Sequence, residues 1–284
     1  MKSRLYYIGQ FIQRSFSKYG MEFRDSKDLN KAAKRCLYYI DKMERDDFLD
    51  NDVDIFIARL IGVFTVGISY QEAITLLCLT GHGLNSSTLV RSQLEAFLIL
   101  FYLIESDDLD KVAQRVVLYE DWVMIKMYLN SKKSGTYELF TINKSHREYL
   151  EHVEANYLRI KAKYSNNETL FKELEKSQSF LKNKRDIAVA ADIEDLYNAV
   201  FSETSATVHI ADISDRMMEV DNDYEYRIYS SEHSMMMTGL SNILLVKSIV
   251  LFTTFFKFSK ETKKKIFKNV RLAKSSQAHA TFKV

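Results

Sequence analysis

Residues 89–104 read LVRSQLEAFLILFYLI, and this stretch decides the fold class. It is almost wholly apolar and holds neither glycine nor proline, as expected for a long buried helix. The same scarcity extends along all 284 residues, which include 8 glycines and no proline. Average proline usage of about 5% predicts roughly 14. Collagen-like, proline-rich and many-turned β-sandwich classes are excluded, because each needs these residues to set special dihedral angles. We therefore expect an all-α protein.

Short polar clusters divide the chain into about ten helical stretches. Their predicted ranges are 3–18, 28–44, 53–80, 87–105, 109–130, 142–164, 168–184, 191–209, 229–258 and 260–273. Ser87, Ser106 and Asn167 each precede a stretch, where a side-chain oxygen can cap the first turn. This pattern predicts a multi-helix bundle with a long apolar core helix near its C-terminus, followed by a basic helix.

No repeat or low-complexity linker marks a division into several domains. We expect one helical domain over residues 1–258, with 55–255 as its core and 1–54 as a helical N-terminal extension. A basic tail over residues 259–284 follows it.

Residues 239–256, GLSNILLVKSIVLFTTFF, raise the question of a membrane span. Asn242 and Lys247 interrupt this run near its middle, so we interpret it as a core helix and expect no transmembrane span. Cys36 and Cys78 lie in apolar helical stretches, which indicates buried thiols in a reducing compartment. The amino terminus lacks the pattern of a secretion signal, and we expect a cytoplasmic protein.

Basic and acidic residues are unevenly distributed, although the formal net charge is only +2. Residues 257–284 hold nine basic groups against Glu261, a balance of +8, whereas residues 186–225 hold eleven acids against Arg216, a balance of −10. A basic end can bind nucleic acid, an anionic membrane surface or the chain's own acidic segment, and it can equally be a solvated helix end. For nucleic acid we expect the contacts to be Lys263, Lys264, Lys265, Lys268 and Arg271.

Arg91 and Glu95 interrupt the apolar stretch, and their i, i+4 spacing places them on one face of the helix. Because that face is otherwise apolar, we expect the pair to be partly desolvated. Such pairs rarely stabilise a protein more than hydrophobic residues would, so the pair indicates either a structural network or a working site. Both interpretations stay open.

A second set of side chains follows at successive i+4 positions: Tyr197, Phe201, Ser205 and His209. They share one helical stripe that ends in a histidine, which can exchange a proton near neutral pH. The alternative is a hydrogen-bonded core histidine. We expect Tyr197, Ser205 and His209 to converge with the Arg–Glu pair in a polar pocket between helices.

The two sets together resemble a bacterial family of uncharacterised all-helical proteins, known only as a domain of unknown function. The resemblance covers about residues 55 to 255 and rests on Leu89, Arg91, Ser92, Glu95, Tyr197, Ser205, Val208 and His209. It implies a helical bundle in which the arginine, the glutamate and the histidine face one another, but no established reaction. The small residue or proline expected after the histidine is replaced by Ile210.

A looser likeness is to HEPN domains, which are helical bundles that often form dimers. Arg227 and His233, in RIYSSEH, match the arginine–histidine spacing of the nuclease members, although Ile228 replaces the usual Asn or Asp. In that chemistry the histidine assists attack of an RNA 2′-hydroxyl on the adjacent phosphate, and the arginine stabilises the phosphate charge without a metal.

These patterns favour two functions. One is a HEPN-like bacterial effector that acts on RNA in a toxin or phage-defence system, which could be a metal-independent ribonuclease with Arg91, Glu95, His209, Arg227 and His233 as candidate catalytic residues. The other is a non-catalytic helical interaction module. The chain holds no nucleotide-binding, hydrolase or zinc motif, and we expect no cofactor and no metal. A homo-oligomer, an RNA or protein partner and, as a third option, membrane-surface association through the tail are further expectations.

Overall fold

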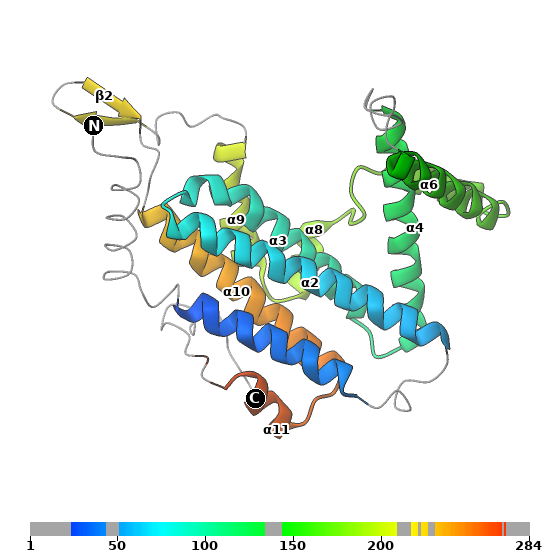
Figure 1. Cartoon of the computed structure of the whole chain (residues 1–284), viewed down its shortest axis with the longest axis horizontal. Helices are drawn as coiled ribbons and strands as arrows, with labels where there is room; N and C mark the ends of the chain where they lie inside the picture. The colour runs from blue at the N-terminus through cyan, green and yellow to red at the C-terminus, as the bar shows by residue number, and fades with distance from the viewer. Residues whose placement is uncertain are drawn as a thin grey trace. The chain divides into compact units, whose positions relative to one another are not determined.

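The computed structural model describes residues 24–43, 51–133, 144–208, 217–220, 223–226, 231–268 and 270. Helices dominate these residues, which confirms the all-α class (Figure 1). Contacts along the chain form two compact units, which are described separately below. Unit 1 comprises residues 1–104 and 184–284, and unit 2 comprises residues 105–183. The predicted division at residue 258 stays a prediction, and no shift in composition pointed to boundaries at 104 and 184.

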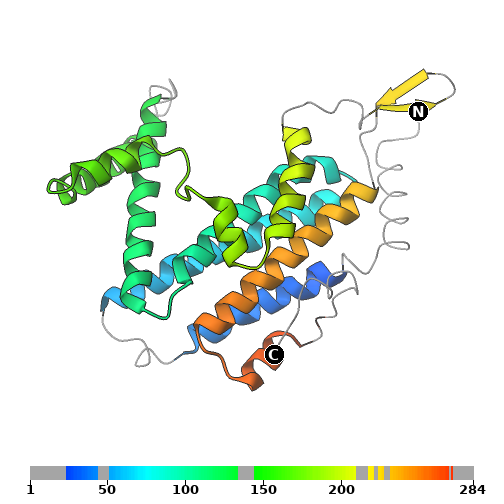
Figure 2. The ribbon, with the colours of Figure 1, turned by 180° about the vertical axis from the view of Figure 1, so that it is seen from behind.

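Unit 1 is built on long apolar helices. Its described helices are one over residues 24–41, α2 (Asn51–Leu79), α3 (Gly83–Ile104), α8 (Lys184–Ala190), α9 (Glu194–Val208), α10 (Ser231–Phe255) and α11 (Lys260–Ile266). Seen from both sides, α2, α3 and α10 pack on one another, and α9 lies against α3 (Figure 2). The long apolar helix predicted over 229–258 is α10, at the centre of this unit.

Unit 1 also contains a short β-hairpin that the helical interpretation of the sequence missed. Strand β1 (Met217–Val220) pairs antiparallel with β2 (Asp223–Tyr226), and Val220 lies opposite Asp223. The polar cluster over 221–223, predicted as a loop, is where one strand ends and the next begins. Alternation over four residues is too short to be distinguished from a loop by periodicity.

The core of unit 1 combines stacked aromatic rings with a buried network of amides and hydroxyls. Phe64 of α2 and Phe252 of α10 are fully buried, with ring centroids 4.3 Å apart. Asn242 Oδ1 accepts hydrogen bonds from Ser26 Oγ at 2.8 Å and from Gln71 Nε2 at 3.0 Å. Three helices are therefore joined at one buried oxygen, which accounts for an asparagine within the apolar run of α10.

Helix α3 begins four residues before the predicted start at residue 87. The glycines at 81 and 83 favour a loop in the sequence, but Gly83 lies in the helix and allows α10 to pack closely against α3. A Cβ at Gly83 would lie 2.2 Å from the backbone nitrogen of Ser234 in α10. Ser87, predicted as a cap, lies inside the helix and donates to Leu84 O at 2.7 Å.

Unit 2 contains α4 (Leu109–Lys133), α6 (Lys144–Lys163) and α7 (Glu168–Lys176). Its core is a cluster of Ile125, Tyr157, Ile160, Phe171 and Leu174. The cap predicted at Asn167 is confirmed, because its side chain accepts from Leu170 N at 3.3 Å. The helix predicted over 168–184 ends at Lys176, because Ser177 adopts an extended conformation.

Candidate functional site

Arg91 and Glu95 lie on α3 as the sequence predicts, and Glu95 is the centre of an ionic cluster. Glu95 Oε1 accepts a hydrogen bond from Lys184 Nζ of α8 at 2.7 Å and lies 4.0 Å from Arg91 Nε. The side chains of Arg91 and Glu95 are 30% and 37% exposed, so solvent screens much of the attraction within this cluster. One carboxylate thus joins the first turn of α8 to the middle of α3.

Arg91 also contacts α9 through an aromatic ring. Its guanidinium carbon lies 4.5 Å from the ring centroid of Phe201, which is within the range of a cation–π contact. The ring of Tyr197 lies 4.4 Å from that of Phe201, one turn earlier in α9. We call these five residues, Arg91, Glu95, Lys184, Tyr197 and Phe201, the α3–α8–α9 clasp.

The clasp brings together only part of the predicted pocket. Arg91 and Glu95 lie together on α3, and Phe201 of α9 contacts both Arg91 and Tyr197. The side chain of Ser205 and all of His209 lie outside the described residues, so the convergence of the polar groups in one pocket stays a prediction. Lys184 was missed by sequence reasoning. It stands 89 positions from Glu95 in the chain, and no local pattern connects the two. Both charges of the α3 pair are engaged with neighbouring helices, which favours a structural role.

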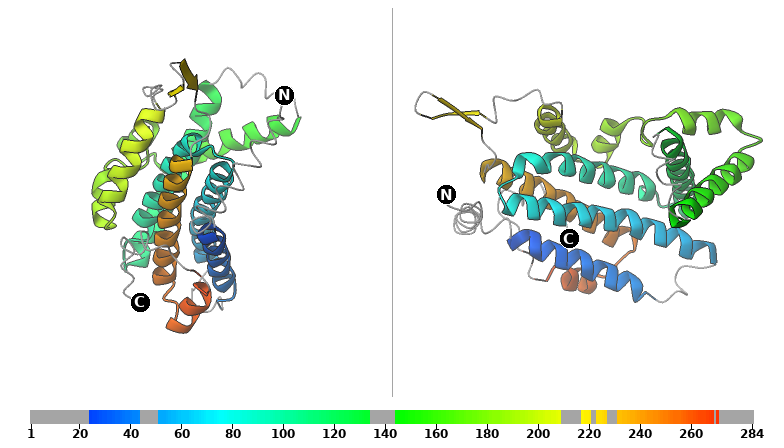
Figure 3. Two further views of the ribbon diagram at one scale, coloured as in Figure 1. Left: turned by 90° about the vertical axis from the view of Figure 1, so that its left-hand side faces the viewer. Right: turned by 45° about the horizontal axis from the view of Figure 1, so that its top comes forward.

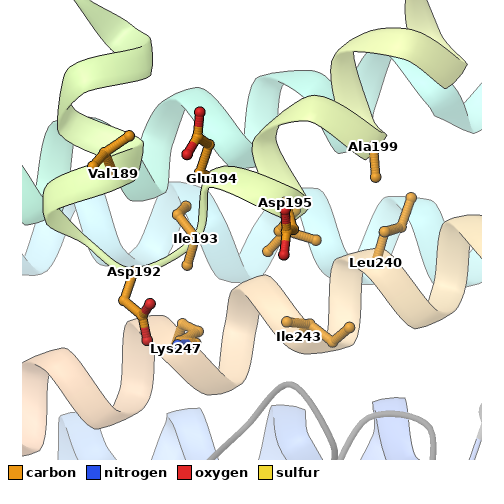
Figure 4. Close-up of a pocket in the computed structure, with 10 residues that line it drawn as sticks. Val189, Asp192, Ile193, Glu194, Asp195, Ala199, Leu240, Ile243 and Lys247 are labelled. Carbon is orange, nitrogen blue, oxygen red and sulfur yellow. The ribbon is translucent and has the colours of Figure 1, made fainter.

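A cavity of about 670 Å³ lies between the α8–α9 turn and α10 (Figure 4). The residues lining it are Val189, Asp192, Ile193, Glu194, Asp195, Leu196, Ala199, Leu240, Ile243 and Lys247. The turn that forms one wall is held by backbone hydrogen bonds from Asp192 to Val189 and from Ile193 to Ala188. Asp192 has a φ of 54°, a left-handed conformation that aspartate tolerates better than most residues.

The cavity combines an apolar floor with charges of both signs. Lys247 is half-buried on α10, and it forms no ion pair among the described residues. Asp192 and Asp195 are exposed at the rim, whereas Glu194 is held by two hydrogen bonds from Arg185, at 3.0 and 2.7 Å. This lining suits reversible binding of a small charged molecule.

The other titratable candidates do not form a catalytic group in the described part of the chain. Burial raises the pKa of Cys36 to about 12 and also raises the pKa of Cys78, so both thiols are neutral and unreactive. Both cysteines are buried and free, as predicted. Within the described residues, no group of three or more His, Cys, Asp or Glu side chains could hold a metal ion.

The HEPN-like motif is only half described. Arg227 lies outside the described residues. His233 lies in the first turn of α10, half-buried and packed near Gly83, so the spacing from arginine to histidine stays a sequence observation.

The basic tail begins with a short helix that is docked on the rest of unit 1. Arg35 of the helix over 24–41 donates from Nη1 to the carbonyls of Ile266 and Lys268, at 3.2 and 2.7 Å. These bonds satisfy carbonyls at the C-terminal end of α11, where an arginine also suits the helix dipole. Of the five predicted nucleic-acid contacts, Lys264, Lys265 and Lys268 are exposed and Lys263 is half-buried, while Arg271 lies outside the described residues.

Three described helices are long and apolar enough to cross a membrane. The ranges are Phe56–Leu79, Gly83–Ile104 and His233–Phe255, with mean hydropathies of 1.5, 1.4 and 1.7. Buried residues account for 28% of the first apolar window and 56% of each of the other two. The sequence pointed only to the third, so the predicted absence of a span stays a prediction.

Comparison with known proteins identifies the family. A model described as a family of unknown function, DUF5677, matches residues 58–225, which include α3 and α9 but not Arg227 and His233. No curated protein and no solved structure matches the chain, and the HEPN likeness finds no support in these comparisons. The match confirms the resemblance to an uncharacterised all-helical family. Because it spans more than half of the chain, the protein belongs to the family of unknown function DUF5677.

Proposed function

We propose that this protein is a non-catalytic helical interaction module. The observation that carries the proposal is the α3–α8–α9 clasp, in which both charges of the α3 pair are used to hold neighbouring helices. Arg91 stacks on Phe201, and Glu95 accepts from Lys184. These contacts are those expected of residues that fix the packing of α3 against its neighbours.

The test separates a structural role from a catalytic one. The variants Arg91→Ala and Glu95→Gln of the full chain are compared by thermal melting and by incubation with RNA. We expect both variants to melt at a lower temperature, with no RNA cleavage by either variant or by the parent chain. Cleavage by the parent that disappears in Glu95→Gln, with an unchanged melting temperature, would overturn the proposal.

Growth assays extend this test to the two histidines predicted as catalytic. If the chain is an effector that uses a histidine, its expression slows bacterial growth, and His209→Ala or His233→Ala relieves the effect. For a non-catalytic module, we expect growth to be the same for the parent and for both variants.

RNA binding through α11 is a second candidate, favoured by the way Arg35 holds that helix. Exposed lysines on a docked helix can meet phosphates with little loss of conformational freedom. Substituting Lys264 and Lys268 by alanine should weaken RNA binding and lower the slope of log affinity against log salt by about one for each phosphate that is no longer neutralised. Lys172 and Lys182 in unit 2 are exposed as well, and their alanine variants are the matched control.

A further inference from the structure

The outward-facing side of α2 exposes apolar side chains among polar ones, and no described residue of unit 1 buries it. Its exposed positions recur every three or four residues, at 58, 59, 62, 65, 66, 69, 72 and 76; we call them the α2 outer face. Val66 is 46% exposed and Leu76 is 65% exposed. Of the three candidate spans, the one in α2 has the smallest buried share, 28%. Val66 and Leu76 are therefore the exposed large apolar side chains of this face.

A basic surface lies directly beside this face. Lys27, Lys31 and Lys34 are exposed and follow one side of the helix over 24–41; we call them the lysine stripe. Lys31 Nζ lies 3.3 Å from Asp28 Oδ1, so this lysine is partly neutralised on its own helix. Lys34 Nζ lies 3.0 Å from Glu72 Oε1 of α2, so the stripe borders the α2 outer face. The two helices lie next to each other in both views of Figure 3. The exposed lysines of α11, which Arg35 attaches to the same helix, add positive charge nearby.

The charged residues of the three apolar helices argue against a span and in favour of surface contact. Arg91 and Glu95 stand in the middle of α3, and Lys247 stands within α10. Charges at the bilayer centre are costly, whereas a helix that lies in the interface keeps its charged side chains in the headgroup region. Arg59 and Glu72 on α2 suit that second arrangement.

We propose that the α2 outer face and the lysine stripe dock together on an anionic lipid surface, with α2 lying along the membrane plane. This inference rests on the proposed function and names the partner of the module. Apolar side chains would enter the boundary between headgroups and acyl chains, and the lysines would meet lipid phosphates. An RNA would use the lysines but would leave Val66 and Leu76 in water, so these two exposed side chains favour lipid.

Flotation of the full chain with vesicles tests the proposal. We expect binding to vesicles of phosphatidylcholine mixed with phosphatidylglycerol, and much weaker binding to phosphatidylcholine alone. Val66→Glu combined with Leu76→Glu should lower the bound fraction roughly tenfold or more. Val117→Glu combined with Leu158→Glu is the matched control, because these unit 2 side chains are 45% and 56% exposed. We expect this control to bind as the parent does.

Alanine in place of all three stripe lysines should weaken binding to the anionic vesicles roughly fivefold for each lysine, with a smaller loss at high salt. Failure of the parent to float with anionic vesicles would overturn the inference, as would a Val66→Glu/Leu76→Glu variant that floats normally. RNA binding that depends on the stripe, without vesicle binding, would also overturn it while leaving the interaction module intact. The proposed function is overturned by a different result, namely RNA cleavage by the parent chain that disappears in Glu95→Gln.

Discussion

Unit 1 joins its central helices mainly through buried, uncharged amides and hydroxyls, although it also buries Asp25 and joins α3 to α8 through Glu95 and Lys184. Unit 2 joins its helices through ionisable groups. In unit 1, Asn242 accepts from Ser26 and Gln71. Next to it, Ser241 Oγ donates to Gln93 Oε1 at 2.6 Å, and Gln93 Nε2 donates to the Ser241 carbonyl at 3.2 Å. All five side chains are buried, and none of them titrates in the physiological range.

In unit 2 the hydrogen bonds between helices are made by carboxylates and phenols. Asp121, only 6% exposed, accepts from Lys163 Nζ at 2.6 Å and from Tyr164 Oη at 2.8 Å. Tyr157 donates to Glu175 Oε1 at 2.7 Å. Burial is the main cause that raises the pKa of both tyrosines, and the hydrogen bonds to the carboxylates raise it further.

The difference follows from the helices that each unit uses. Long apolar helices can hide neutral polar groups at low cost when those groups pair with one another. The charge-rich helices of unit 2 instead bury the carboxylate of Asp121, which accepts from the 46% exposed Lys163 and from Tyr164. We therefore expect packing defects to dominate the mutational response of unit 1, and pH to have its clearer effect on unit 2.

Phe252→Ala should produce the largest loss. Phe252 is fully buried and stacks on Phe64 with an interplanar angle of 14°. Truncation of a buried phenylalanine lowers the free energy of unfolding by about 3–5 kcal/mol. Denaturant unfolding followed by hydrogen exchange should place the loss in α2, α3 and α10. Equal loss of hydrogen-exchange protection in α4 and α6 would show that the effect is not confined to unit 1.

Asn242→Leu comes next, because it leaves two buried donors without their acceptor. The hydroxyl of Ser26 and the amide of Gln71 would both lose hydrogen bonds, and we expect about 2–3 kcal/mol of destabilisation by denaturant unfolding. Gln71→Leu should cost less, because Gln71 Oε1 already has no hydrogen-bond partner among the described residues. The double variant Gln71→Leu/Asn242→Leu should be less destabilised than the sum of the single variants. Simple additivity would show that the network is not cooperative.

Much of the fold follows from the missing prolines, because no helix interior is interrupted by a residue that lacks an N–H. Asn167 was correctly predicted as a cap, since a local side-chain oxygen and the following helical pattern are enough to define it. The start of α3 was misplaced, because glycine breaks helices in general but at Gly83 it allows α10 to approach. That reason lies in a contact between segments far apart in the sequence.

In the candidate site, too, local patterns were predictable and contacts between distant segments were not. The i, i+4 relation of Arg91 and Glu95 and the stripe that includes Tyr197 and Phe201 are local properties, and the structure brings these two sets together. Lys184 could not be predicted, since its relation to Glu95 depends on how α8 folds back on α3. The cavity beside Lys247 was missed for the same reason, because its charges come from separate helices.

Tyr157→Phe should sharpen the contrast in pH response. Folding raises the pKa of Tyr157 to about 12 from its usual 10. The phenol therefore contributes full stability below pH 10, and this contribution is lost as the pH rises from 10 to about 12. At neutral pH the free energy of unfolding of the variant should be lower by about 1.5 kcal/mol, because the hydrogen bond to Glu175 is lost. Between pH 10 and about 12 its free energy of unfolding should decline less than that of the parent chain.

The control for this pH effect is Tyr149→Phe, on the same helix but 50% exposed. Its alkaline unfolding profile should match that of the parent chain. Tyr164 and Cys36 also have raised pKa values, so some decline remains in every variant. An alkaline profile that Tyr157→Phe leaves unchanged would exclude this phenol as a source of pH sensitivity.

Glu95→Gln should have the smallest effect, even though the clasp joins three helices. Glu95 and Arg91 are about one-third exposed, so solvent screens much of the attraction between their charges. We expect a loss of at most about 1 kcal/mol in thermal or denaturant unfolding, because the glutamine oxygen still accepts from Lys184. Glu95→Leu should lose more, since Lys184 and Arg91 would then face each other without an anion between them. An effect of Glu95→Gln comparable to that of Phe252→Ala would mean that unit 1, like unit 2, depends on buried charge, and the contrast between the two units would no longer hold.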